Sequence, residues 1–89
     1  MVDNQIILYK FIKINNNVDW YLISYRYKLS ENFIRKFQDK VNWYHISACQ
    51  ILSESFIKEF KYKVDWLNIL YNQKLSEEFK SEFKYKLND

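Results

Sequence analysis

The chain has 89 residues, of which 48% are hydrophobic and 20% aromatic, a size that fits one domain and a composition that argues against intrinsic disorder. It contains no Gly and no Pro, which argues against β-hairpins with tight turns and against Gly-rich phosphate-binding loops. The formal net charge of +3 is too small to indicate nucleic-acid binding by itself.

Residues 1–17 are predicted to form an N-terminal capping segment. They carry the apolar stretch Ile6-Ile7-Leu8, and the pair Phe11-Ile12 precedes the first Val-Asp-Trp of the chain. We interpret this pair as part of a degenerate helix that covers the start of the repeats described next. The apolar stretch is too short to cross a membrane, and the single Cys49 cannot form an internal disulfide. We therefore expect an intracellular protein with no membrane contact.

Three tandem units of 23 residues follow, at 18–40, 41–63 and 64–86, and residues 87–89 begin a truncated fourth unit. Val18-Asp19-Trp20 recurs as Val41-Asn42-Trp43 and as Val64-Asp65-Trp66. Nine positions are identical in all three units, which chance does not produce. Residues 18–89 are therefore predicted to be a repeat domain, because tandem units of this length are typical of solenoids.

Each unit is predicted to hold two short helices. The first begins after Asp19, Asn42 or Asp65, which are favourable N-cap residues, and the second begins after Ser30, Ser53 or Ser76. A Val before the first cap and an Ile five residues later have hydrophobic-staple spacing. We expect Tyr25, Ala48 and Tyr71 to extend the apolar stripe of the first helix. Glu31, Glu54 and Glu77 lie in the first turn of the second helix, where the helix dipole favours negative charge.

The predicted fold is all-α, an α-solenoid of three two-helix repeats with an N-terminal capping segment. A strand interpretation fails because the apolar spacing in the second half of each unit fits one face of a helix. A leucine-rich repeat is excluded because its alternating leucines are missing. The predicted core consists of one Trp and two Phe from each unit: Trp20, Trp43, Trp66, Phe33, Phe37, Phe56, Phe60, Phe79 and Phe83.

The units, with the pattern Val-Asp/Asn-Trp, then Leu-Ser-Glu and two Phe, resemble short Trp-containing tandem repeats of uncharacterised proteins from large DNA viruses of amoebae and related protists. The resemblance covers residues 18–86 and implies no catalytic residue. It would place the protein in the cytoplasm of a host cell. Unit 3 departs from the pattern at Leu70 and Lys80.

No enzyme activity is expected. His45 and Cys49 are four residues apart on a predicted helix, but neither recurs in the other units. Two such side chains are too few for a zinc site, and a Cys–His nucleophile needs further groups. We therefore predict no catalytic residue, no metal and no cofactor.

The first functional hypothesis is a scaffold for protein–protein interaction, because repeat proteins keep core positions and vary exposed ones. The candidate partner surface consists of variable positions of the first helices: Tyr21, Leu22, Arg26, Tyr44, His45, Cys49, Leu67, Asn68 and Asn72.

Two alternatives are left open. Cations on the second helices and after them could form a row that follows phosphates. This candidate nucleic-acid row consists of Arg35, Lys36, Lys40, Lys61, Lys63, Lys84 and Lys86. The other alternative is structural self-association by end-to-end stacking, since no polar cap is visible after unit 3.

Overall fold

The computed structural model describes residues 4–15 and 17–87. Within that part the chain forms eight helices and no strand. Their bounds are α1 (Asn4–Ile14), α2 (Trp20–Arg26), α3 (Glu31–Lys36), α4 (Trp43–Cys49), α5 (Glu54–Glu59), α6 (Trp66–Asn72), α7 (Glu77–Glu82) and α8 (Lys84–Leu87). Residues 1–3 and 16 of the predicted capping segment, and residues 88–89 of the predicted fourth unit, lie outside the described residues.

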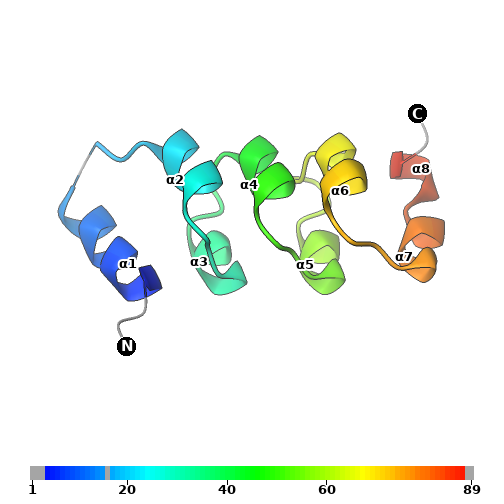
Figure 1. Ribbon diagram of the computed structural model, residues 1–89, viewed down its shortest axis with the longest axis horizontal. Helices are drawn as coiled ribbons and strands as arrows, with labels where there is room; N and C mark the ends of the chain where they lie inside the picture. Colours follow the sequence, from blue (N-terminus) through cyan, green and yellow to red (C-terminus); the bar gives the residue numbers. More distant parts are fainter. Residues whose placement is uncertain (1–3, 16, 88–89) are drawn as a thin grey trace.

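The helices form two rows along an elongated body of 43 × 27 × 18 Å. One row contains the first helices of the units, α2, α4 and α6, and the other contains the second helices, α3, α5 and α7 (Figure 1). Within the first row, α2 packs on α4 and α4 packs on α6. This arrangement confirms the predicted all-α solenoid of two-helix repeats.

Two kinds of N-cap begin the helices of every unit. The carboxylate or amide oxygen of Asp19, Asn42 or Asp65 accepts a hydrogen bond from the backbone three residues later, and Ser30, Ser53 and Ser76 do the same for the second helices. Helices of six or seven residues are marginal in isolation. They are held here by these caps and by packing on their neighbours.

The aromatic core lies between the two rows. In each unit the Trp packs on the second Phe, with ring centroids 5.1–5.2 Å apart. The structure buries five of the six predicted Phe side chains, whereas Phe37 and all three Trp are partly buried. The indole Nε1 of Trp43 donates to the carbonyl of Gln38 at 2.9 Å, and that of Trp66 donates to Lys61 at 3.0 Å. Each of these indole rings therefore packs on the core and also forms a hydrogen bond to the turn that precedes its helix.

Hydrogen bonds from side chains join each unit to the next. The Oγ of Ser24 accepts from the backbone N–H of Asn42 at 2.8 Å, and Ser47 does the same for Asp65 at 2.9 Å. Glu31 accepts from the backbone N–H of Ser53 at 2.6 Å. Glu31 lies in the first turn of α3, as predicted, and its oxygens also bond to the N-cap residue of the second helix in the next unit. Glu54 contacts Ser76 in the same way.

Gln50 joins units 1 and 2 through three hydrogen bonds of its side-chain amide. Its Nε2 donates to the carbonyls of Ser24 and Tyr27 at 2.8 and 2.7 Å, and its Oε1 accepts from the N–H of Leu29 at 2.9 Å. The carbonyls at the C-terminus of α2 lack partners within the helix, so one amide satisfies both that end and the following segment. Gln73 repeats the arrangement one unit later.

Unit 3 lacks two buried residues, an Ile and a Ser, that units 1 and 2 have at the positions of Lys80 and Leu70. Ile34 and Ile57 are fully buried, whereas the corresponding Lys80 is exposed. The buried Ser24 and Ser47 correspond to Leu70. Residues 84–87 form α8, which packs on α6 and α7, although the corresponding segments of units 1 and 2 form turns. Leu87, predicted to begin a fourth unit, ends this helix.

Candidate interaction surface

The exposed side of α2 and α4 carries a group of aromatic side chains centred on His45. The imidazole ring lies 4.2 Å from the ring of Tyr21, 5.2 Å from Tyr44 and 5.4 Å from Tyr25, measured between centroids. The rings of Tyr21 and Tyr25 are 5.8 Å apart. We call these four residues the aromatic cluster. Three of them, Tyr21, Tyr44 and His45, belong to the predicted partner surface, and the structure brings them together across two units.

Exposure distinguishes the tyrosines of this cluster from the core. Tyr21 and Tyr44 are each 57% exposed, while His45 between them is partly buried. The contacts of His45 with Tyr21 and Tyr44 are edge-to-face, with ring planes at 79° and 87°. Aromatic pairs favour this geometry, so the rings restrain one another although they face outward.

The predicted burial of Tyr25 and Tyr71 was wrong. Tyr25 is 42% exposed and Tyr71 is 75% exposed. The buried side of α2 is formed by Ile23 and Ser24, because the hydroxyl of Ser24 bonds both to the carbonyl of Trp20 and to the next unit. Tyr25 lies in the last turn and joins the aromatic cluster instead. Its i,i+4 spacing from Tyr21 was the sequence signal for this contact.

The other residues of the predicted partner surface are distributed along the same row of helices. Arg26 and Cys49 are exposed and line, with Tyr25 and Ile51, a groove between the C-terminal ends of α2 and α4. Leu22 is partly buried. On α6, Leu67 is exposed, and the amide of Asn72 donates to that of Asn68 at 3.2 Å. The predicted partner residues are thus aromatic at Tyr21, Tyr44 and His45 on α2 and α4, whereas on α6 they are a leucine and two asparagines.

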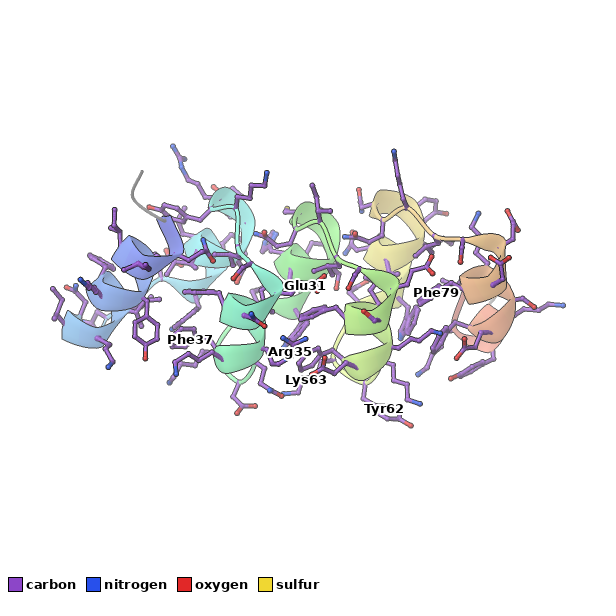
Figure 2. All side chains as sticks on the ribbon, turned by 90° about the horizontal axis from the view of Figure 1, so that it is seen from below. Glu31, Arg35, Phe37, Tyr62, Lys63 and Phe79 are labelled. Atoms are coloured by element: carbon purple, nitrogen blue, oxygen red, sulfur yellow. The ribbon has the colours of Figure 1, made fainter. Side chains whose placement is uncertain are left out.

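The candidate nucleic-acid row begins on α3 with Arg35 and Lys36, and ion pairs connect the successive second helices α3, α5 and α7. Arg35 donates two hydrogen bonds to Glu59, at 2.9 and 2.8 Å, and Figure 2 shows Arg35 between α3 and α5. These bonds lower the pKa of Glu59 below its ordinary value and raise the pKa of Arg35. Lys58 and Glu82 pair at 2.9 Å across the next gap.

Further cations of the row are also engaged. Lys63 pairs with Asp39 at 3.0 Å. The amines of Lys61 and Lys86 lie 5.2 and 5.7 Å from the ring centroid of Tyr62, which is 84% exposed. Carboxylates therefore neutralise Arg35 and Lys63 within the candidate nucleic-acid row.

The described residues offer no group of three or more His, Cys, Asp or Glu side chains that could hold a metal ion. Cys49 is a free thiol at the exposed end of α4. In the same part of the chain, no helix has the length and apolar character needed to cross a bilayer.

Comparison of the chain with models of protein families, with curated proteins and with solved structures gives no significant match.

Proposed function

We propose that this protein is a non-catalytic scaffold that binds another protein through the aromatic cluster and the adjacent exposed residues of α2, α4 and α6. The observation that carries the proposal is the set of exposed tyrosine rings packed around His45. Tyrosines dominate many protein interfaces because they bury a large area at a low entropic cost.

The framework beneath the cluster supports this proposal. Buried Ile23 and Ile46, the hydrogen bond that Ser24 accepts from Asn42, and the bond that Gln50 donates to Ser24 fix α2 against α4. Because Tyr21, Tyr25 and Tyr44 also contact the same imidazole, a partner meets rings that are already ordered. Pre-organisation of this kind lowers the cost of association.

A pull-down with paired variants tests the proposal. The resemblance of the repeats to proteins of amoebal viruses makes an amoebal lysate the first source of partners, and the viral origin and host-cytoplasm location remain part of the proposal. The wild-type chain should retain a protein that the double variant Tyr21→Ala/Tyr44→Ala loses. The matched control, Tyr62→Ala/Tyr85→Ala, removes two exposed tyrosines from other positions. Failure of the wild type to retain any protein, or equal retention by both double variants, would contradict the proposal.

Electrostatic binding of nucleic acid is the second candidate. Tyr62, flanked by Lys61 and Lys86, could stack on a base while the two amines contact phosphates. The ion pairs of Arg35 and Lys63 argue against nucleic-acid binding, because two cations of the row are already neutralised by carboxylates. Titration with labelled single-stranded DNA and RNA at two salt concentrations decides the matter, since such binding must weaken as salt rises. Absence of binding at low salt would end this candidate.

Self-association by end-to-end stacking is less well supported. The exposed Lys80 and the replacement of a buried Ser by Leu70 remove from unit 3 the contacts that join units 1 and 2 to their successors. Sedimentation over a range of concentrations should therefore show a monomer, and a concentration-dependent increase in mass would restore this candidate.

A further inference from the structure

A groove of about 280 Å³ lies between α1 and α3, away from the aromatic cluster. Ile6, Tyr9 and Lys10 line it from α1, and Phe33 and Lys36 line it from α3. The floor is apolar, and no acidic side chain is among the residues that line it. Figure 2 shows Phe37 in the same region, between α1 and α3, and its ring centroid is 5.9 Å from that of Tyr9.

Helix α1 occupies the place of a second helix in a preceding unit. The Oε1 of Gln5 accepts from the backbone N–H of Ser30 at 2.9 Å, as the carboxylate of Glu31 accepts from Ser53 one unit later. Gln5 therefore corresponds to Glu31, and Tyr9, four residues further on, corresponds to Arg35. Leu8 and Ile12 pack against the core from this position.

The spaces between successive second helices differ in charge from the space between α1 and α3. The gap between α3 and α5 is bridged by Arg35 and Glu59, and that between α5 and α7 by Lys58 and Glu82. Between α1 and α3, Tyr9 and Lys36 take these positions, and the amine lies 5.2 Å from the ring centroid. A lysine thus replaces the carboxylate of the inner gaps.

The α1–α3 groove is consequently both apolar and positively charged. Neither Lys10 nor Lys36 forms an ion pair within residues 4–15 and 17–87. Lys13 adds a third cation, whose amine lies 5.1 Å from the Tyr9 ring. Hydrogen bonding to Lys36 lowers the pKa of the Tyr9 phenol, as expected beside uncompensated cations. On α1, Ile6, Ile7 and Phe11 are about half exposed.

We propose that the α1–α3 groove binds an acidic amphipathic helix of a partner protein. Its apolar side chains enter between Ile6 and Phe33, and its carboxylates pair with Lys10 and Lys36. A helix in a groove is a common mode of recognition, with anchors three or four residues apart. Phe33 is only 6% exposed on the groove floor. A projecting side chain can reach it, whereas a flat lipid surface would meet only the exposed rim.

Selection from a displayed library of helical peptides of about 15 residues tests this proposal, with the full chain as bait. The wild type should enrich peptides that combine an excess of Asp and Glu with apolar residues at i and i+4. The variant Lys10→Glu/Lys36→Glu should instead enrich Lys and Arg. It should bind the wild-type-selected acidic peptides about tenfold or more weakly, because attraction becomes repulsion. The variant Lys40→Glu/Lys84→Glu, with the same change in net charge outside the groove, should bind these peptides as the wild type does.

Two further measurements separate the alternatives. The Tyr21→Ala/Tyr44→Ala variant should bind the selected acidic peptides unchanged, so failure of the aromatic cluster as an interface leaves this proposal standing. Binding of the wild type to vesicles with about 30% phosphatidylserine, without acidic enrichment in the library, would assign the face to lipid and overturn it. Equal affinity of the acidic peptides for Lys10→Glu/Lys36→Glu and for the wild type would overturn it as well.

Discussion

Replacement of Gln50 by Ala should strongly destabilise the solenoid without touching its aromatic core. The side chain is 4% exposed and makes three hydrogen bonds of 2.7–2.9 Å to backbone groups of the preceding unit. All three bonds are made by one side-chain amide, so a single substitution removes them together.

The magnitude follows from these contacts. A buried hydrogen bond contributes about 1 kcal/mol net, so three bonds predict a loss of about 3 kcal/mol in the free energy of unfolding. Gln73→Ala removes the equivalent three bonds at a half-buried site, where water can replace part of them, and should cost about 1–2 kcal/mol. Gln50→Glu keeps the shape but points a carboxylate oxygen at the carbonyls of Ser24 and Tyr27, so it should destabilise as well.

Urea unfolding followed by far-ultraviolet circular dichroism measures these free energies. Gln50→Ala should lower the urea concentration at the unfolding midpoint more than Gln73→Ala does. The m-value, which is the slope of the unfolding free energy against urea concentration, should stay unchanged. A loss below about 0.5 kcal/mol for Gln50→Ala, within the usual range for surface substitutions, would refute the reasoning. A Gln50→Glu variant as stable as the wild type would refute it too, because the bonds from Nε2 could then not matter.

Other predictions concern the core and the ion pairs. Trp43→Ala should cost about 3 kcal/mol in urea unfolding, and Trp43→Phe should cost less because it loses mainly the bond to the turn. The lowered pKa of Glu59 means that its pair with Arg35 contributes stability above the ordinary carboxyl pKa and loses it as pH falls through the lowered value. Thermal unfolding across acidic pH should therefore show a smaller acid-induced loss for Glu59→Gln. In a spectrophotometric titration, one tyrosine step should lie below the ordinary tyrosine pKa, and this step should disappear in Tyr9→Phe and move upward in Lys36→Met.

The caps and the core of this fold could be predicted from the sequence because they are local. An Asp, Asn or Ser before a helix and a Trp paired with Phe recur at fixed spacing, and the structure has them where the spacing indicates. The role of Gln50 could not be predicted, since the corresponding residue in unit 1 is Tyr27 and the variation suggested a surface position. Its partners lie 21–26 residues away, and only the stacking of units brings them close.

The candidate surfaces show the same division. The 23-residue spacing places Lys40, Lys63 and Lys86 at the same position of each unit, but the ion pairs of the cations depend on how successive units pack. Arg35 and Glu59 are 24 residues apart, one more than the repeat, and so are Lys63 and Asp39. For the partner surface, the variable positions were identified, whereas the meeting of Tyr21 and His45 across two units required the packing of α2 on α4.

Photo-crosslinking from the aromatic cluster tests the proposed function most directly. A benzophenone amino acid in place of Tyr44 should form a crosslink to a protein of the amoebal lysate, and the same group in place of Tyr62 should not. Both tyrosines are exposed, so the comparison isolates position and not accessibility. Crosslinking from position 62 alone, or from neither position, would contradict the assignment of the partner surface to α2 and α4.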